Sequence, residues 1–316
     1  MARALAIVLV STLSAAAAPL STTCAAPQTR PAGAQTPAAA APVFDSAKAW
    51  EHLRQMVAIG PRPAGSAQLR QTRAYITRQL TSAGLTVQEQ PFTATTPLGK
   101  IDMVNLIVRL PGRRSDRILF TGHYDTKLFK DQVFVGASDG ASSGAFLIEL
   151  ARVLKAQPTR EFTYEFVWFD GEEAVVDWTG QDHTYGSRYY VQAAQKAGAL
   201  TSIKAMVLVD MIGAKSLKIQ RDGNSAKWMN DILWSAAKRL NYGHVFADID
   251  TQVEDDHMEF TRVGIPCLDI IDLNDYPQWH NSMGVDDLEH VEAKSLQAVG
   301  DVLLAAIPEF ERYLAR

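Results

Sequence analysis

The chain has 316 residues, of which 47% are hydrophobic, and its formal net charge is -4. This length and hydrophobic content are sufficient for one large α/β domain or two ordinary domains with a substantial core. Because the net charge is small and no Lys/Arg-rich run occurs, the composition gives no support for nucleic acid or an anionic membrane surface as a partner.

The N-terminal segment is organised like a secretory signal peptide, which we place at residues 1–26. A single basic residue, Arg3, precedes an apolar run to Leu20, and small residues follow. A transmembrane anchor is the alternative, but the run is shorter than the roughly 20 residues that span a bilayer. We therefore expect a secreted or periplasmic protein with no stable membrane span. A lipoprotein tether through Cys24 is a further alternative, although the preceding Ser21-Thr22-Thr23 matches such a signal poorly.

Residues 27–43 are rich in alanine and proline and are predicted to form a disordered linker, since they bury too little apolar surface to fold. Residues 44–316 are predicted to form one folded domain, because no internal repeat and no second boundary occurs. If Cys24 leaves with the signal peptide, Cys267 is the single remaining cysteine. The domain then has no intramolecular disulfide and depends on its core. We expect a monomer.

The folded domain begins with two predicted helices, one that follows Asp45-Ser46 and ends before Gly60, and one that ends at Gly84. Strands are predicted at residues 86–95, 103–110, 117–121, 162–169, 205–210 and 267–271, and later helices at residues 144–154, 187–197, 226–240 and 291–313. Strands that alternate with helices predict an α/β fold. We expect a mixed, mainly parallel central β-sheet flanked by helices on both faces.

Ionisable side chains follow several of these strands. The apolar run Phe166–Phe169 leads into Asp170-Gly171 and then Glu172-Glu173. Adjacent residues of an extended segment point in opposite directions, so one carboxylate can face a metal ion and the other a substrate proton. Taken alone, the pair fits a solvated loop equally well. The other strand ends add four candidates, which are His123, Asp139, Asp210 and His280. The carboxyl ends of parallel strands share one rim, so these side chains are expected to converge.

Several carboxylates at one rim favour a bound cation. Buried carboxylates repel one another, and an unpaired buried charge costs several kcal/mol. A mixture of Asp, Glu and His without cysteine suits a catalytic zinc site, in which three protein ligands leave one position open. The chain has no HExxH helix, so the ligands must come from separate strand ends.

Five short motifs occur in order along the chain, namely Gly122-His123-Tyr124-Asp125, Ser138-Asp139-Gly140-Ala141, Phe169-Asp170-Gly171-Glu172-Glu173-Ala174, Leu208-Val209-Asp210-Met211-Ile212-Gly213 and Asp255-Asp256-His257. They resemble the motifs of the zinc-dependent aminopeptidase superfamily. Together with Trp178, Gln181-Asp182, Tyr185-Gly186-Ser187-Arg188 and Trp279-His280, they most resemble the glutaminyl-peptide cyclotransferases, or glutaminyl cyclases. The resemblance runs from about Trp50 to the C-terminus.

The resemblance implies a zinc aminopeptidase-like fold in which Asp139, Glu173 and His280 bind one zinc ion. It implies that Glu172 is the general acid/base. The implied reaction cyclises the N-terminal glutamine of peptides or proteins to pyroglutamate and releases ammonia. In that reaction zinc polarises the γ-carboxamide oxygen, while Glu172 takes a proton from the α-amine and delivers it to the departing ammonia.

The resemblance also assigns the surroundings of the metal. Asp210 and Asp255 would form a catalytic, hydrogen-bonded acidic pair that shares a proton and holds the substrate amine. Trp178 and Trp279 would be substrate-binding pocket walls. The segment from Asp272 to Tyr276 is more acidic than expected of the animal enzymes in this family, which leaves the polarity of the pocket and the substrate preference open.

A secreted two-zinc aminopeptidase is the main alternative, since His123 and Asp210 can hold a second zinc ion with Asp139 bridging. A carboxylate pair of Asp210 with Asp255 would remove a ligand from that second ion, and two tryptophans would narrow the pocket to a small side chain. Both points favour the cyclase. A binding domain without catalytic activity is a third hypothesis. It would leave the candidate acid/base and metal-ligand residues without a catalytic role.

Overall fold

The computed structural model describes residues 9–14, 43–280 and 285–316 of the chain. Contacts divide the chain into two units, Met1–Ala40 and Ala41–Arg316. Within the first unit, residues 9–14 form no helix or strand. The remainder of the predicted signal peptide at 1–26, and the predicted linker at 27–43 except Val43, lie outside the described residues.

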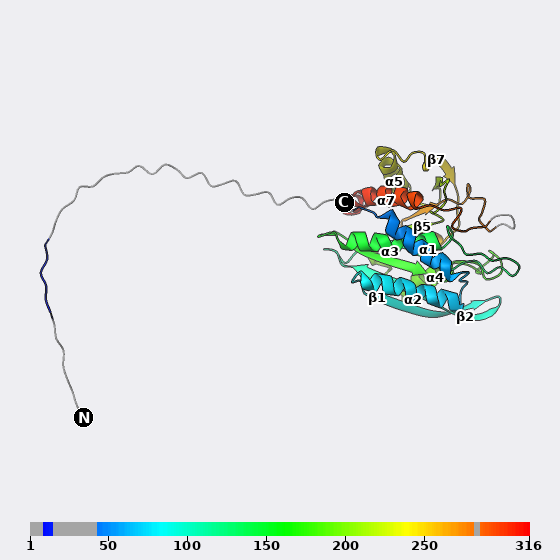
Figure 1. The fold of residues 1–316 in the computed structure, drawn as a ribbon, viewed down its shortest axis with the longest axis horizontal. Helices are drawn as coiled ribbons and strands as arrows, with labels where there is room; N and C mark the ends of the chain where they lie inside the picture. The colour runs from blue at the N-terminus through cyan, green and yellow to red at the C-terminus, as the bar shows by residue number, and fades with distance from the viewer. Residues whose placement is uncertain (1–8, 15–42, 281–284) are drawn as a thin grey trace, which may run out of the picture. The chain divides into compact units, whose positions relative to one another are not determined.

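A six-stranded sheet forms the centre of the second unit (Figure 1). In spatial order its strands are β1 (Val87–Thr96), β2 (Gly99–Leu110), β4 (Thr163–Phe169), β3 (Arg117–His123), β5 (Ile203–Asp210) and β8 (Cys267–Ile271). The β1–β2 and β2–β4 pairings are antiparallel, whereas β4–β3, β3–β5 and β5–β8 are parallel. The predicted α/β fold with a mixed, mainly parallel sheet is confirmed.

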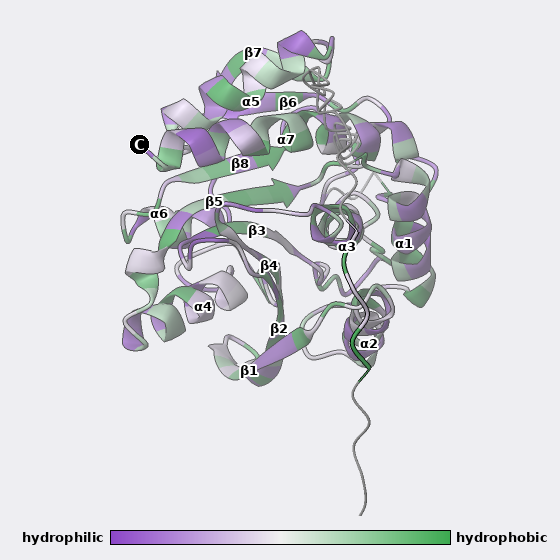
Figure 2. Ribbon diagram, turned by 90° about the vertical axis from the view of Figure 1, so that its left-hand side faces the viewer, coloured by the Kyte–Doolittle hydropathy of each residue, from purple (hydrophilic) through white to green (hydrophobic). Residues whose placement is uncertain are grey.

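Helices cover both faces of this sheet (Figure 2). One face packs against α1 (Ser46–Ile59), α2 (Ala67–Ser82), α3 (Ala141–Lys155) and α7 (Ala293–Leu314), and the other against α4 (Tyr185–Lys196) and α6 (His257–Thr261). Neighbouring strand residues serve opposite faces: Phe120 belongs to the first core and Leu119 to the second. Successive side chains of a pleated strand point to opposite faces, so the sheet has a separate hydrophobic core on each face.

The strands in the middle of the sheet are buried on both faces. All seven residues of β3 are buried. A strand covered on both sides needs a continuous apolar sequence rather than an alternating one, as the run Ile118–Phe120 illustrates. Strands β3, β4, β5 and β8 are mutually parallel, so their carboxyl ends lie at one edge of the sheet. The segments that follow these ends carry the ionisable side chains, which locates the candidate site.

Four elements were not predicted from the sequence, one of which is the 3₁₀ helix η1 (Leu200–Ser202). Strands β6 (Ile219–Asp222) and β7 (Phe246–Thr251) form a separate two-stranded parallel sheet, and α6 has five residues. Both strands are short and largely polar, and a five-residue helix is too short to show a hydrophobic period. Helix α5 (Lys227–Arg239) was predicted and packs on the first face with α7.

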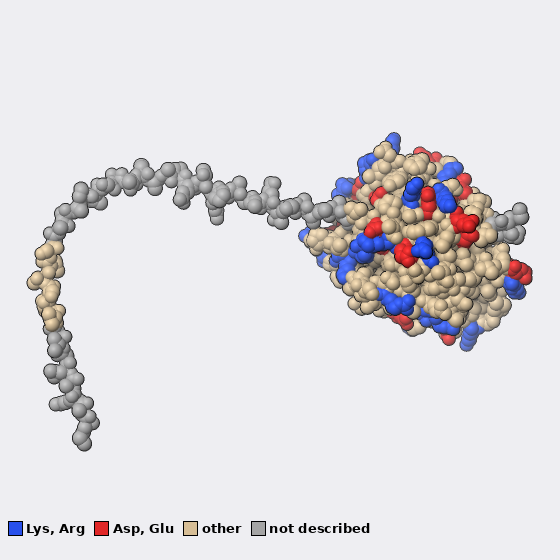
Figure 3. All heavy atoms as spheres, viewed as in Figure 1, with Lys and Arg blue, Asp and Glu red and all other residues tan. Residues whose placement is uncertain are grey.

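The surface of the described residues carries charges of both signs. On the face shown in Figure 3, basic and acidic side chains are interspersed over the helices. Among the described residues, no helix combines the length and the hydropathy that a membrane crossing requires.

Candidate active site

The Glu172-Glu173 pair follows β4 and is held by a buried carboxylate. Asp125, just beyond β3, accepts the Glu172 backbone N–H at Oδ1 (3.2 Å) and the Glu173 N–H at Oδ2 (3.3 Å). The carbonyl oxygen of Glu172 accepts the N–H of Thr184 at 2.7 Å. Both side chains are almost fully buried. The pair is therefore fixed by its backbone, which rules out the solvated-loop interpretation.

Asp139, Glu173 and His280 bring three metal-ligand atoms together. Nε2 of His280 lies 3.0 Å from Oε1 of Glu173 and 3.0 Å from Oδ2 of Asp139. One donor atom from each residue lies within 4.8 Å of the others. Oε2 of Glu173 is buried without a hydrogen-bond partner. A buried carboxylate oxygen without a donor, beside a second carboxylate and an imidazole nitrogen, fits a zinc ion.

The electrostatics of these three residues also fit a cation. Burial raises the pKa of Glu173 to about 7, with the His280 charge opposing and the Asp139 charge reinforcing the rise. Burial acts in the same direction on Asp139, but hydrogen bonds from His123 and His280 outweigh it and lower the pKa of Asp139. The two neighbouring carboxylates, Asp139 and Glu173, repel each other, and a divalent cation between them would neutralise this repulsion.

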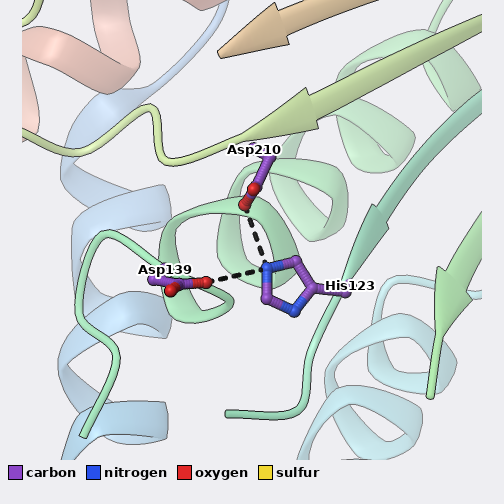
Figure 4. A group of neighbouring side chains, drawn as sticks. All are labelled: His123, Asp139 and Asp210. Carbon is purple, nitrogen blue, oxygen red and sulfur yellow. Dashed lines mark hydrogen bonds and ion pairs between the residues drawn. The ribbon is translucent and has the colours of Figure 1, made fainter. Parts of the chain in front are cut away.

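His123 connects this group to the end of β5 (Figure 4). Its Nε2 atom lies 3.1 Å from Oδ1 of Asp139 and 3.0 Å from Oδ1 of Asp210. These residues form a second group with the composition of a metal site. The imidazole is fully buried, and although burial lowers its pKa, the charges of Asp210 and Glu172 raise it well above the ordinary value.

Glu172, Asp210 and Asp255 form the acidic part of the site. Burial raises the pKa of Glu172 well above its ordinary value; His123 opposes this, and Asp255 and Glu173 add to it. Burial and the Asp210 charge raise the pKa of Asp255 in the same way. Oδ1 of Asp255 accepts the Asp256 backbone N–H, whereas its Oδ2 is buried without a hydrogen-bond partner. Glu172 and Asp255 therefore both favour the protonated form.

All eight residues predicted for the site line one cavity of about 270 Å³. Trp178 and Trp279 are 37% and 38% exposed, respectively, and so lie at its mouth. The Trp279 ring stacks on His280, with centroids 4.7 Å apart, and Trp178 stacks on His183 at 4.2 Å. The complete lining is Lys127, Asp139, Glu172, Glu173, Trp178, Asp210, Met211, Val253, Glu254, Asp255, Ile271, Leu273, Trp279 and His280.

The acidic segment from Asp272 to Tyr276 presents an apolar residue, Leu273, to the cavity. Asp272 is buried and accepts the Lys218 backbone N–H at 3.1 Å, and Asp275 pairs with the Lys218 side chain. Neither acid lines the cavity. The polarity that the sequence left open at this wall is therefore set by Ile271 and Leu273.

Backbone strain concentrates at this site. Among the described residues, four that are not glycine have positive φ, and His280 (46°), Met211 (49°) and Thr184 (48°) are three of them. Met211 follows Asp210 and lines the cavity, and Thr184 bonds to the Glu172 carbonyl. Such conformations cost of the order of 1–3 kcal/mol and are typical of functional sites.

Sequence reasoning missed two residues that support the site, Arg62 and Asp286. Arg62 lies in the turn-rich segment between α1 and α2 and is fully buried, and Asp286 is 1% exposed. Both bond to the backbone around Asp139. An arginine among glycines and prolines is a weak signal for a buried guanidinium, and the sequence around Asp286 carries none.

A third group of potential metal ligands, Asp222, His257 and Asp269, lies outside the cavity lining. All three side chains are 0% exposed. The His257 ring lies between the two carboxylates, with Nε2 3.3 Å from Asp222 and Nδ1 3.5 Å from Asp269. Each ring nitrogen therefore faces a different carboxylate, and the group is separate from the cavity that the predicted site residues line.

Comparisons with known proteins agree with this geometry. Residues 105–307 match the model of peptidase family M28. A glutaminyl-peptide cyclotransferase-like protein of Mus musculus is 32% identical over 267 residues, which cover 75% of this chain and 69% of the relative. The structure of an Acidobacteriales bacterium glutaminyl cyclase is similar with a TM-score of 0.81 and 36% identity, covering 90% of this chain and 99% of that one.

A leucine aminopeptidase precursor from Bacteroides thetaiotaomicron has the same fold, with a TM-score of 0.77 and 25% identity over 84% of this chain and 98% of its own. The similarity thus extends to a protein that is named as a peptidase. The family match covers more than half of the chain, and the curated relative is matched over more than two thirds of its length. The chain therefore belongs to peptidase family M28 and groups there with the glutaminyl-peptide cyclotransferases.

Proposed function

We propose that the chain cyclises the N-terminal glutamine of peptides or proteins to pyroglutamate with release of ammonia. The observation that carries this function is the small cavity in which a protonatable Glu172 lies beside a zinc-type ligand set, under two tryptophans. A cavity of about 270 Å³ suits one side chain and its amine. The mouse relative and the Acidobacteriales enzyme are named for this activity.

Asp139, Glu173 and His280 would hold one zinc ion. Their converging donor atoms and the unpartnered Oε2 of Glu173 support this assignment. When bound there, zinc supplies a Lewis acid that polarises the γ-carboxamide carbonyl. Stacking of Trp279 on His280 holds the imidazole plane from the cavity side.

Glu172 acts as the general acid/base. The α-amine attacks the γ-carbonyl carbon, a C–N bond forms to close the five-membered ring, and Glu172 accepts the proton that the amine loses. The bond to the amide nitrogen then breaks as Glu172 returns this proton, so ammonia leaves and no net proton is consumed. Its raised pKa suits a group that both accepts and donates at neutral pH.

Asp210 and Asp255 position the substrate amine and share a proton. The buried Oδ2 of Asp255, which lacks a hydrogen-bond partner, supports this role because a proton between two close carboxylates would satisfy it. Trp178 and Trp279 are the walls that exclude larger side chains. Together these residues hold the amine, orient the side chain and limit water.

A two-zinc aminopeptidase is the second candidate, and the His123–Asp139–Asp210 group is the observation in its favour. The cavity weighs against it, because about 270 Å³ is small for the varied side chains that an aminopeptidase accepts.

We also propose a domain organisation, which rests on the composition of the N-terminal residues. Residues 1–26 would be a signal peptide, 27–43 a linker, and 44–316 the catalytic domain of a secreted or periplasmic monomer. A tether through Cys24 is the alternative for the leader. Mass spectrometry of the exported protein would locate the cleavage site and detect a lipid.

One assay separates the hypotheses. The purified protein is offered a glutamine-initiated dipeptide and a leucine anilide, each with and without a chelator. Ammonia from the dipeptide alone, lost with the chelator, supports the cyclase. Free amine from the anilide would support the aminopeptidase. No turnover of either substrate would support a binding domain.

A further inference from the structure

The backbone that carries Asp139 is unusually tightly packed. We call residues 135–139, which lead from the end of β3 into α3, the ligand turn. Gly136 has φ +51°, and a Cβ there would lie 2.2 Å from the carbonyl oxygen of Asp139. Gly140 has φ +89°, and its Cβ would lie 2.3 Å from the Asp125 carbonyl oxygen. Both positions therefore require glycine, since they combine positive φ with no room for a Cβ.

Arg62 fastens one half of this turn. Its guanidinium is fully buried and donates to the carbonyl oxygens of Val135 at 2.6 Å and of Gly136 at 2.9 Å. Its Nε donates to the carbonyl oxygen of Tyr124 at 3.0 Å. Tyr124 follows His123 at the end of β3. One planar side chain thus joins the ligand turn to the neighbouring strand end.

Asp286 fastens the other half. Its carboxylate accepts the N–H of Ser138 at 2.8 Å and of Asp139 at 2.9 Å, and its carbonyl oxygen accepts the N–H of Ala137 at 3.2 Å. Arg62 binds the carbonyls of residues 135 and 136, and Asp286 binds the amides of residues 137 to 139. Five consecutive residues therefore have a backbone group held by one of these two side chains or its backbone.

The charge of Arg62 also decides how its role can be tested. The guanidinium is surrounded by the charges of Asp286, Asp139, Asp125 and Glu173, and it stays protonated at neutral pH. A positive charge beside a cation site repels the incoming cation. Charge alone would therefore weaken metal binding, whereas holding the turn would strengthen it. The two contributions have opposite signs.

We infer that Arg62 and Asp286 are positioning residues that hold the ligand turn, so that Asp139 is aimed at the metal before the ion binds. This inference rests on the zinc site proposed above. Outer residues that orient metal ligands change metal affinity by roughly 10–100-fold when they are replaced. The two residues act through the backbone of a ligand and touch neither the metal nor the substrate.

The test is zinc affinity, measured on the full chain by competition with a chelator of known affinity. Arg62→Gln and Asp286→Asn are expected to bind zinc ~10–100-fold more weakly than the wild type. Arg62→Lys, which keeps the charge but loses the planar fork, is expected to bind more weakly as well. The absorption spectrum of bound Co²⁺ should change in all three variants, because it reports ligand geometry and needs no turnover.

Arg117→Gln is the matched control. Arg117 is a second buried arginine, 8% exposed, and it bonds to Glu165 and Tyr190 away from the cavity. Its replacement removes a buried guanidinium and should lower the melting temperature while leaving zinc affinity unchanged.

The measured zinc affinities decide whether the positive charge of Arg62 or its hold on the ligand turn has the larger effect on metal binding. Wild-type or tighter zinc binding in folded Arg62→Gln would overturn the inference, because charge would then dominate over positioning. If that variant does not fold, Arg62→Lys carries the decision, because it keeps the positive charge and loses the planar fork that binds the two carbonyl oxygens. Equal loss of affinity in Arg117→Gln would also overturn it, since the effect would then be general destabilisation. Failure of the wild type to bind zinc would instead refute the proposed metal site itself.

Discussion

The Nε2 atom of His123 lies 3.0 Å from Oδ1 of Asp210. The same nitrogen lies 3.1 Å from Oδ1 of Asp139, and a proton shared between Asp210 and Asp255 would make Asp210 unavailable to a second metal ion in this group. We therefore predict one zinc ion per chain at full activity, measured by elemental analysis of protein titrated with zinc. Two equivalents at full activity would favour the aminopeptidase instead.

Replacement of Glu172 should separate proton transfer from metal binding. Glu172→Gln keeps the side-chain shape but cannot accept a proton, so we expect kcat to fall ~10²–10⁴-fold with zinc retained. Stopped assays of ammonia release and metal analysis of the same sample measure both quantities. Glu51→Gln, an acid-to-amide change at an exposed residue of α1 outside the cavity lining, is the control. Unchanged turnover in Glu172→Gln would remove this residue from the mechanism.

Trp279 should act on substrate binding. It stacks on His280 and is partly exposed at the cavity mouth, so Trp279→Ala removes an aromatic wall. We expect KM to rise about fivefold, in line with ~1 kcal/mol for an aromatic contact, and Trp279→Phe to restore most of the loss. Trp228→Ala removes a ring that stacks on Tyr313 instead and should leave KM unchanged. Equal KM changes in both alanine variants would contradict this role.

Asp170 should make stability depend on pH. Burial, with the Asp125 charge adding, raises its pKa to about 8, whereas an unfolded chain has a value near ~4. The folded state thus binds the proton more tightly, and this contribution is fully present below pH ~4 and lost as pH rises through about 8.

Asp170→Asn mimics the protonated side chain. Between pH 5 and pH 8 the free energy of unfolding of the wild type should therefore fall relative to the variant, by an amount on the order of a few kcal/mol. Urea unfolding of the metal-free proteins at both pH values measures the difference. Parallel pH profiles would show that Asp170 has the same affinity for protons in the folded and unfolded states.

Cys267 should be unreactive in the native protein. Its thiol is 1% exposed, donates to the carbonyl oxygen of Ile265 at 3.2 Å, and has a pKa raised to about 12 by burial. Iodoacetamide at pH 8 should modify it only after unfolding, because the thiolate is the reactive form. Peptide mass mapping distinguishes Cys267 from Cys24. Rapid modification of Cys267 before unfolding would contradict its burial.

The sheet and its covering helices could be predicted because their sequences are long and apolar. The run Phe166–Phe169 and the segment Val207–Val209 are buried on both faces, and such continuous hydrophobicity indicates a central strand. Helix α6 and strands β6 and β7 could not be predicted, since they have four to six residues each. Tertiary contacts define these short elements, and the local sequence does not.

Part of the cavity lining was predictable for a related reason. Glu172 follows a buried strand and Asp210 ends one, so sheet geometry predicts their positions, whereas Trp178, Asp255 and Trp279 were assigned from the family resemblance. Arg62 and Asp286 bind backbone carbonyls and amides more than 60 residues away, and such contacts leave no pattern in the sequence. The acids at Asp272 and Asp275 were expected near the pocket, yet bonds to Lys218 turn them away from it.

Strand β1 forms one edge of the six-stranded sheet. It carries Pro91, which has no N–H to donate, and the exposed charge of Glu89. A strand from another molecule that approached this edge would meet a missing donor and an unfavourable charge. The edge therefore discourages sheet extension between chains, and this protection against aggregation suits an enzyme that must stay dispersed while its substrates are themselves peptides.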